Sequence, residues 1–326
     1  MTAIAQSQHP EAGLRPMDVR RDLGEVAALI EICFGDQLDG GGRAAVREKK
    51  ALSQYGPLLG LFGGLLKHVP GWHLGFVWME DGRLVGNVGL QPSPANRAEW
   101  LIANVAVHPD YRRLGIARRL MRAAIEMAAN QGGRAALLQV DNDNEGARRL
   151  YDELDFDSIA TYTHWERRVR QTPPLLGSAY PTARLAARQD ARAVFDLLQV
   201  ARPYGLAWTQ PLDMRNLRPS FYRWLNNTVN GRREEQWLLG PAASPDGWMC
   251  LQFNLGRADR IALVARAASG AQRERVERAL LVRGLRRFGR RPWPVRIEHP
   301  AGRSDALFEE YRFQPLRTLR WMRLAL

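Results

Sequence analysis

Cysteine and long apolar runs are scarce in this chain of 326 residues, and both scarcities exclude classes of protein. The two cysteines, Cys33 and Cys250, are too few for a disulfide framework and are typical of reduced thiols in a cytoplasmic protein. No apolar run reaches the roughly 20 residues of a membrane-spanning helix. The nearest candidate, residues 57–66, is short and interrupted by glycine. We therefore expect a cytoplasmic protein with no membrane partner.

Signals for export and for metal binding are also missing. Residues 1–12 have neither a basic start nor an apolar stretch, so we interpret them as a disordered tail and not as a signal peptide. His68 and His73 have no cluster of cysteines or carboxylates beside them, so we expect no metal ion.

Lysine is nearly absent, and the formal net charge of +13 comes almost entirely from arginine. The arginines are spread along both halves of the chain, often beside Glu and Asp, which is typical of solvated faces. Their field also attracts polyphosphate ligands. The densest cluster, Arg286, Arg287, Arg290 and Arg291 around Phe288, resembles a helix end more than a surface that stacks bases. We expect no nucleic-acid partner.

A basic turn is the most informative segment of the chain. A strand is predicted over residues 100–107 and a helix over 116–129, and Arg112-Arg-Leu-Gly-Ile-Ala117 lies between them. Gly115 and the small Ala117 let a ligand approach the backbone closely. The amides at the start of the helix point outward with the positive end of the helix dipole behind them, which predicts an anion site. The positive side chains beside this site are Arg112, Arg113 and Arg118.

Two known phosphate-binding motifs do not fit this turn. No Gly-Lys-Ser/Thr ends it, so it is not a P-loop, and the three-glycine spacing of a dinucleotide fingerprint is missing. The competing interpretation is a solvated arginine turn whose glycine caps the helix. The strand before the turn and the helix after it favour the ligand site.

A second block of sequence follows, with a strand predicted over residues 135–140 and a helix over 145–154. The two blocks, V-A-V-H-P-D-Y-R-R-L-G-I-A-R-R-L-M and V-x-x-x-N-x-x-A-R-R-L-Y-x-x-L-x-F, resemble the acetyl-CoA-binding core of the GNAT acyltransferase superfamily. The first carries the family's Arg/Gln-x-x-Gly-x-Gly/Ala signature, and the second matches its Asn and Tyr at Asn144 and Tyr151. Asp155 stands where the family usually has Gly, and Asp tolerates the left-handed conformation.

The rest of the first half follows the family's order of elements. The resemblance covers residues 13–170 and is strongest over 100–156. The further predicted elements are a strand over 14–17, a helix over 23–33 capped by Asp22, strands over 73–79 and 84–90 joined by an Asp-Gly turn, and a closing strand over 157–166.

The second half repeats this order, which indicates an internal duplication. A proline-marked linker over 171–181 separates the domain over 13–170 from a second domain over 182–326. The second domain is predicted to contain helices over 191–200, 272–288 and 304–311 and strands over 260–265, 295–298 and 316–324. We therefore predict an α/β (α+β) fold of two tandem GNAT-like domains, each a twisted, mixed, mostly antiparallel sheet flanked by helices.

The second copy has lost the chemistry of the first. Residues 268–273 replace the basic turn, and no Gly-x-Ala opens the following helix. Registering Phe313 on Phe156 places Phe308 at the position of Tyr151, and a phenyl ring neither donates nor accepts a proton. We expect the first domain to be the active copy and the second to be degenerate.

The resemblance implies how acetyl-CoA would bind as the acyl donor. The strand ending at Val107 splays from its neighbour, so its backbone pairs with the pantetheine arm. The diphosphate rests on the amides from Arg113 to Arg118, and a nearby backbone amide polarises the thioester oxygen. The implied cofactor-binding residues are Val105, Ala106, Val107, Arg112, Arg113, Leu114, Gly115, Ile116, Ala117, Arg118, Asn144 and Tyr151.

Tyr151 is the candidate general acid, because a phenol within hydrogen-bond reach protonates the leaving thiolate. The alternative is that Tyr151 only packs on its helix. The general base is harder to assign: of the candidates Glu99 and Asn104, Glu99 lies early in the central strand and Asn104 does not titrate. A water relay with Glu99 or Glu80 as a distant participant stays open. Positioning of the two reactants alone supplies roughly 7–11 kcal/mol.

Three functions remain open. The first is transfer of an acetyl group from acetyl-CoA to a primary amine of a small molecule or peptide. The second is a mycothiol-synthase-like tandem enzyme that acetylates an amino-thiol conjugate, although in that family the active copy is the C-terminal one. The third is a CoA-binding regulatory module without turnover. We expect a monomer with an intrachain pseudo-dimer, or a homodimer.

Overall fold

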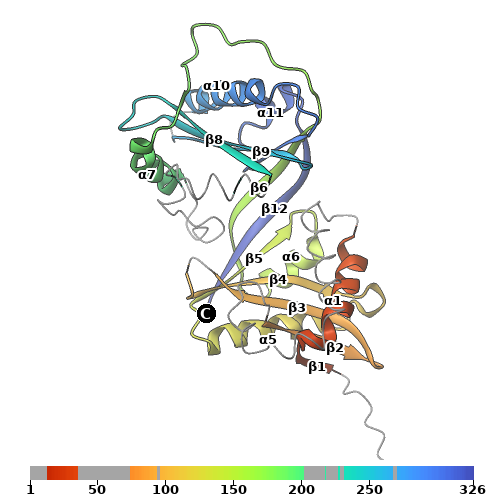
Figure 1. The fold of residues 1–326 in the computed structure, drawn as a ribbon. Coiled ribbons are helices and arrows are strands. Elements are labelled where there is room, and N and C mark those ends of the chain that lie inside the picture. The colour runs from red at the N-terminus through yellow and green to blue at the C-terminus, as the bar shows by residue number, and fades with distance from the viewer. Residues whose placement is uncertain are drawn as a thin grey trace, which may run out of the picture. The chain divides into compact units, whose positions relative to one another are not determined.

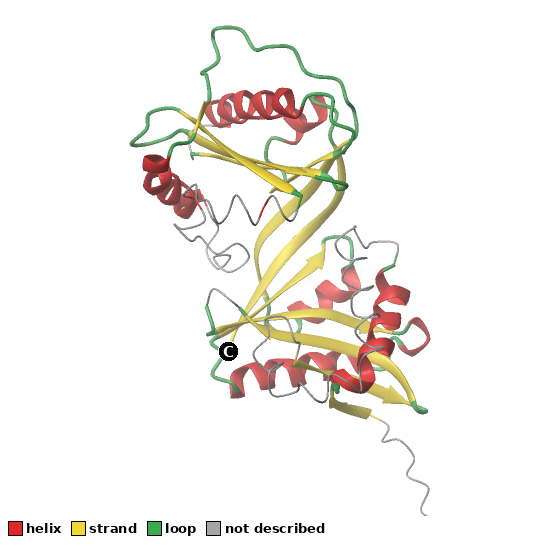
Figure 2. Cartoon of the chain, viewed as in Figure 1, coloured by secondary structure: helices red, strands yellow, loops and turns green. Residues whose placement is uncertain are grey.

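The computed structural model describes residues 13–35, 74–93, 96–201, 217, 227, 231–266 and 270–326. The chain divides into two compact units of helices and strands (Figure 1, Figure 2). The first unit comprises Met1–Gln139, Arg149–Asp157 and Met322–Leu326, and the second comprises Val140–Arg148 and Ser158–Trp321. Within the described residues, no helix is long and apolar enough to cross a membrane.

The first unit is built on a sheet with strand order β1-β2-β3-β4-β5, in which β1 to β4 pair antiparallel and β5 pairs parallel to β4. This mixed, mostly antiparallel sheet confirms the predicted fold class. The elements of this half are β1 (Gly13–Pro16), α1 (Val19–Phe34), β2 (Leu74–Glu80), β3 (Arg83–Pro92), β4 (Glu99–Val107), a 3₁₀ turn (Pro109–Tyr111), α5 (Ile116–Asn130), β5 (Ala135–Asp141) and α6 (Glu145–Asp152).

The predicted hairpin is present, whereas the predicted start of the first helix is wrong. Asp81 and Gly82 both have positive φ (48° and 73°), as a two-residue turn between right-twisted strands requires. α1 begins at Val19, so Asp22 lies inside the first turn and is not the cap. The first turn forms before Asp22, because the Asp22 carboxylate accepts hydrogen bonds from the amide of Asp18 and from Arg15.

Helices α1 and α5 cover opposite faces of this sheet. Val26 of α1 packs in a buried cluster with Val77 of β2 and Ala106 of β4. Trp78, the neighbour of Val77 on β2, lies under the guanidinium of Arg119 of α5, 5.3 Å from the ring centre. Because successive residues of a strand point to opposite faces, the two helices sandwich the sheet.

The second unit has the strand order β6-β11-β10-β9-β8-β7, in which β10 and β11 are parallel and the other neighbours antiparallel. The elements of this half are β6 (Asp157–Arg167), β7 (Arg184–Leu185), a 3₁₀ turn (Arg188–Asp190), α7 (Ala191–Ala201), β8 (Arg232–Leu239), β9 (Gly247–Asn254), β10 (Asp259–Ala265), α10 (Gly270–Phe288), β11 (Val295–Pro300), α11 (Asp305–Glu310) and β12 (Gln314–Ala325).

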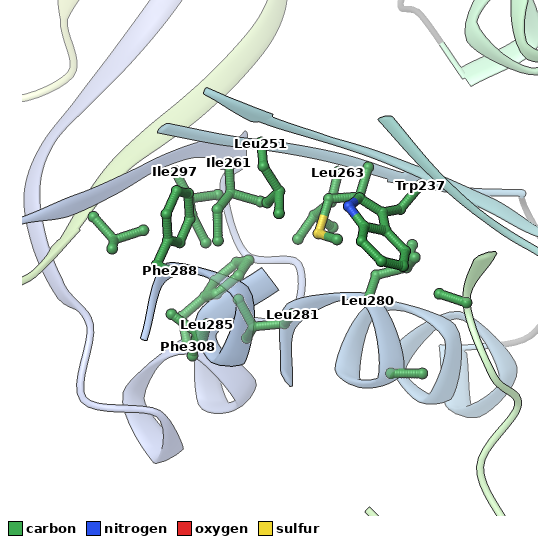
Figure 3. Close-up of a cluster of buried hydrophobic side chains, with 14 of the residues drawn as sticks. Trp237, Leu251, Ile261, Leu263, Leu280, Leu281, Leu285, Phe288, Ile297 and Phe308 are labelled. Carbon is green, nitrogen blue, oxygen red and sulfur yellow. The ribbon is translucent and has the colours of Figure 1, made fainter. Parts of the chain in front are cut away.

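Helices also cover both faces of the second sheet. Leu280 and Leu285 of α10 face Leu251 and Ile261 of the sheet in a buried cluster of hydrophobic side chains (Figure 3). On the other face, α7 packs against β8 and β9 through Leu197. The second unit therefore repeats the helix-sheet-helix layering of the first.

One arginine-aspartate pair occurs at the start of both copies. Arg15 donates to the two carboxylate oxygens of Asp22 at 2.6 and 2.7 Å. Arg184 donates to those of Asp190 at 2.7 and 2.8 Å. In each case a backbone amide donates to the same carboxylate at 2.7 Å. This recurrence, together with the recurring element order, supports the duplication.

The registration of Phe308 on Tyr151 is also supported by geometry. The rings of Tyr151 and Phe156 lie 6.1 Å apart, and those of Phe308 and Phe313 lie 5.9 Å apart. The turn inside each pair holds one left-handed residue, Asp155 at φ 62° and its counterpart in the second copy at φ 61°. The departure from glycine at Asp155 is therefore tolerated, as expected.

The boundaries of the compact units differ from the predicted domain boundaries at the last strand of each copy. β6 after Asp157 belongs to the second unit, where Tyr162–Arg167 pair antiparallel with Val295–Pro300. The end of β12 belongs to the first unit, where the amide of Leu326 donates to the carbonyl of Arg134 at 3.1 Å. Each unit thus contains strand residues from the other half of the sequence.

The Arg184–Asp190 pair predicts a pH-dependent contribution to stability. Hydrogen bonds from Arg184 and the amide of Ala187 lower the pKa of the Asp190 carboxyl. Asp190→Asn is expected to lower the free energy of unfolding by about 2–3 kcal/mol at pH 7, because it breaks buried bonds to a charged group. Because the folded pKa of this carboxyl lies below its unfolded pKa of about 3.9, its full contribution to stability is present above the unfolded pKa. That contribution is lost as the pH falls through the folded pKa.

Urea denaturation at descending pH measures this difference. The matched control is Asp196→Asn, which breaks an exposed pair with Arg192 on the same helix and is expected to cost under about 1 kcal/mol. A wild-type advantage over Asp190→Asn that stays constant down to the acid unfolding transition would contradict the assignment.

Candidate active site

β4 and β5 separate after a short stretch of pairing. Their parallel register joins Glu99–Leu101 to Ala135–Leu137, and both strands continue beyond it. The amide of His108 donates to the carbonyl of Val85 on β3 (2.8 Å), so its neighbour Val107 directs its backbone groups away from β3. The predicted splay is therefore present, with the backbone of Val107 directed to its open side.

A β-bulge interrupts β4 just before this end. Asn87 of β3 pairs with Ala106, and Gly89 pairs with Ala103, so Asn104 and Val105 together oppose one residue of β3. Asn104 has a positive φ of 54°, which re-aims its peptide groups. A bulge at this place supplies backbone groups that the ladder does not use.

The basic turn is a cradle of backbone amides. Gly115 has φ 77° and precedes α5 without a side-chain cap, and Arg113 has φ 67°. Among the described residues, no backbone carbonyl accepts from the amides of Arg113 to Arg118. A Cβ atom added to Gly115 would meet no atom within 4 Å, so the space over the turn is open. This geometry matches an anion site at a helix start.

The arginines of the turn differ in what they contact. Arg112 donates through Nε to the carbonyl oxygen of Val107 (3.3 Å), and the thiol of Cys33 donates to the same oxygen (3.4 Å). Arg118 forms an ion pair with Glu153. Arg113 is exposed at the turn. Burial raises the pKa of the Cys33 thiol, and the nearby Arg112 opposes this shift.

From the sequence, Arg112 was expected only to place a positive charge beside the anion site, and its hydrogen bond to Val107 was not expected. It makes Arg112 an anchor of the end of β4. Only the fold brings Cys33 of α1 to the same oxygen, so no sequence signal points to it. Cys33 and Cys250 are not in a disulfide.

Tyr151 is buried in α6, with 6% of its surface exposed. Desolvation raises the pKa of its phenol to about 12. Among the described residues, no hydrogen-bond partner is found for its hydroxyl group. A buried phenol with this pKa stays protonated at neutral pH, which suits a general acid.

The remaining predicted residues are placed as follows. Asn144 caps α6, with its Oδ1 accepting from the amide of Ala147 at 3.1 Å, and it belongs to the second unit. Glu99 is the first residue of β4 and lies about 20 Å along the strand from Val105. Burial raises the pKa of the Glu99 carboxyl, and Arg323 opposes this shift. Glu80 accepts from the indole of Trp78 at 3.0 Å.

The structure therefore brings together the splay, the bulge and the cradle, because β4 leads directly into the turn before α5. Glu99 lies at the far end of the strand. In the described part of the chain, no group of three or more His, Cys, Asp or Glu is placed to hold a metal ion, and His68 and His73 lie outside that part. Residues 57–66 lie outside it as well.

Among its described residues, the second unit keeps the splay without the bulge, and residues 267–269 of the turn before α10 lie outside the described part. β10 and β11 pair only over Asp259–Ile261 and Val295–Ile297, as β4 and β5 do. β9 and β10 pair without a register shift, so no bulge is present in β10. Phe308 is fully buried between Trp165 and His299.

An open strand edge that leads into an anion site at a helix start characterises this α/β fold. Residues 57–156 match the model of the acetyltransferase (GNAT) family. The chain belongs to the GNAT superfamily of acetyltransferases. It is 31% identical over 218 residues to the mycothiol acetyltransferase of Kineococcus radiotolerans, covering 64% of this chain and 66% of that protein.

Two solved structures match over nearly the whole chain. One is a GCN5-related N-acetyltransferase from Sphaerobacter thermophilus, with 17% identity, a TM-score of 0.58 and coverage of 96% of this chain and 95% of that one. The other is a tandem GNAT protein from the clavulanic acid biosynthesis pathway, with 16% identity, a TM-score of 0.55 and coverage of 97% and 98%. These neighbours show the fold. The chain spans less than two thirds of the length of the first curated relatives it matches.

The open cradle predicts the effect of a charge placed in it. Gly115→Glu is expected to abolish CoA binding, because the carboxylate would occupy the anion site and strain a left-handed residue. Calorimetric titration with CoA measures the affinity. Gly132→Glu is the matched control, because Gly132 has φ 78°, equally open surroundings and a place at the other end of α5. Equal CoA affinities for the two variants would show that CoA does not bind at the Gly115 turn.

Proposed function

We propose that this protein transfers an acetyl group from acetyl-CoA to a primary amine of a small molecule or peptide. The observation that carries the proposal is the splay of β4 from β5, which opens beside the cradle formed by Gly115 and the start of α5. An extended donor with a diphosphate at one end needs both features, a strand edge for its arm and amide donors for its anion.

The acyl donor binds mainly through the backbone in this proposal. The pantetheine arm lies along β4 at Val105 and Val107, and the diphosphate accepts from the amides of the cradle. Because Arg112 and Cys33 already donate to the Val107 carbonyl, the arm uses the amide of Val107 and not its carbonyl. A backbone amide of the bulge donates to the thioester oxygen and stabilises the negative charge that develops there.

The transfer itself is direct. The amine nitrogen attacks the thioester carbon, the carbon-sulfur bond breaks, and the sulfur leaves as thiolate. The phenol of Tyr151 gives its proton to this thiolate, the attacking nitrogen loses a proton to water, and the Tyr151 phenolate regains a proton from water. A thiol has an ordinary pKa of about 8.5, so the thiolate needs only modest help to leave.

A mycothiol-type acceptor is the second candidate. Its support is the match to a mycothiol acetyltransferase over 64% of this chain, which is more than one copy of the duplication. An amino-thiol conjugate is also a small molecule with an amine to acetylate, so this candidate changes the acceptor and leaves the proposed chemistry unchanged.

The interactions of the arginine cluster argue against a nucleic-acid partner. Arg287 pairs with Glu235 and Arg291 pairs with Asp259, while Phe288 is buried. These guanidinium groups are engaged within the protein, and the ring is not exposed for stacking. A cytoplasmic location stays a prediction.

The general-acid role of Tyr151 is tested by release of free thiol from acetyl-CoA in the presence of a panel of amines. Tyr151→Phe is expected to lower kcat at pH 7 by about 100-fold or more with unchanged CoA affinity. The defect should shrink above about pH 9, where thiolate leaves without a proton. The wild type should show no loss from phenol ionisation up to about pH 10, because the pKa is about 12.

Tyr111→Phe serves as the control for removal of a phenol beside the turn. A Tyr151→Phe variant as active as Tyr111→Phe would refute the role. If CoA binds and no amine ever releases thiol, the protein is a CoA-binding regulatory module and the proposed enzymatic function is wrong.

The degenerate second copy predicts the binding stoichiometry. Calorimetric titration should give one CoA per chain, because β10 has no bulge and Phe308 is packed in the core. The single CoA site, which lies in the first copy, should lose its binding in Gly115→Glu. A stoichiometry of two, with one site surviving that substitution, would show that the second copy still binds the donor.

A further inference from the structure

Asn87 is a polar residue in the middle of an apolar strand. β3 runs Arg83-Leu-Val-Gly-Asn-Val-Gly-Leu90 before its last two residues, and its residues from Leu84 to Leu90 are all buried. Asn87 itself is 2% exposed. Burying an amide side chain is unfavourable unless its hydrogen bonds are made, so the residue calls for an explanation.

Half of the amide is used to hold the bulge. Nδ2 of Asn87 donates to the carbonyl oxygen of Asn104 at 2.9 Å. Asn104 is the left-handed residue of the bulge, and its carbonyl is turned out of the ladder. This bond also fixes the orientation of the Asn87 amide, because only the NH₂ group donates to a carbonyl.

The other half of the amide has no partner. Oδ1 of Asn87 is buried and accepts no hydrogen bond from any described residue. Leaving a buried acceptor unsatisfied costs about 1–3 kcal/mol, and such atoms are rare in folded proteins. An apolar side chain of the same shape would avoid this cost, so the atom points to a donor that arrives with a ligand.

The position of Asn87 indicates which ligand brings the donor. Asn87 is paired with Ala106, whose side chain packs in the cluster of α1, so the amide lies on the face of the sheet that α1 covers. The proposed donor arm runs along the open edge of β4, in the plane of the sheet. A group that approaches the thioester from this face is the acceptor.

We propose that Oδ1 of Asn87 accepts a hydrogen bond from an N–H of the acceptor amine. This bond orients the amine so that the lone pair of its nitrogen points at the thioester carbon. This inference rests on the proposed acyl transfer. The neutral amide takes no proton, so it orients the nucleophile and leaves deprotonation to water. It also accounts for a site in which Glu99, the candidate base, lies at the far end of β4.

Two variants separate contact with the substrate from support of the bulge. Asn87→Leu removes both hydrogen-bonding groups, whereas Asn87→Asp keeps an acceptor atom and loses the bond to Asn104. Asn87→Leu is expected to raise the KM of the amine at least about 10-fold with the Kd of CoA within about twofold. Asn87→Asp should keep the amine KM within about threefold of the wild type.

Stability gives an independent readout. Asn87→Leu should unfold at a urea concentration close to that of the wild type, because removal of the unsatisfied Oδ1 acceptor offsets loss of the bond to the Asn104 carbonyl. Val88→Ala, on the opposite face of β3, is the control: it should lower stability and leave the amine KM unchanged. If Asn87→Leu fails to fold, Asn87→Ala takes its place in the comparison with Asn87→Asp.

The outcomes distinguish this inference from the function it rests on. Equal rises in amine KM for the Leu and Asp variants would show that Asn87 acts only through the bulge and would overturn the proposal. So would a wild-type amine KM in Asn87→Leu. A wild-type protein that binds CoA and acetylates no amine would instead overturn the proposed function.

Discussion

The candidate site depends on a pair of strands that stop pairing. β4 and β5 hydrogen-bond only over their first residues, and beyond Leu101 the backbone of β4 is no longer in register with β5. A strand edge inside a sheet is unfavourable unless something else uses its polar groups. In this protein the free edge leads directly into the turn at Gly115, so two sets of unused backbone groups lie at the same end of β4.

The bulge and the anchor at Val107 maintain this geometry from both sides. Asn87 holds the carbonyl of Asn104, while Arg112 and Cys33 hold the carbonyl of Val107. These bonds come from β3, the turn and α1, and each ends on a backbone oxygen of β4. The strand is thus held in shape by contacts from three elements, which leaves its amides for a ligand.

Duplication explains the rest of the architecture. The second copy retains the parts that build the fold, including the arginine-aspartate pair at Arg184 and Asp190 and the splay of β10 from β11. It lacks the bulge, and a phenyl ring replaces the phenol at Phe308. The fold of the second copy therefore persists without the bulge and the phenol, since packing and the buried carboxylate of Asp190 do not depend on them.

Local patterns in the sequence predicted most elements, the Asp-Gly hairpin and the turn at Gly115, because periodicity, helix starts and turn residues act over a few positions. The tertiary structure was needed to show that α1 begins at Val19, where Asp22 accepts hydrogen bonds from Arg15 and from the amide of Asp18. It also decided that Arg112 contacts Val107, and that Asn87 meets Asn104 across a bulge. Those contacts depend on strand register, which is set by the packing of whole faces and is not written in any short segment.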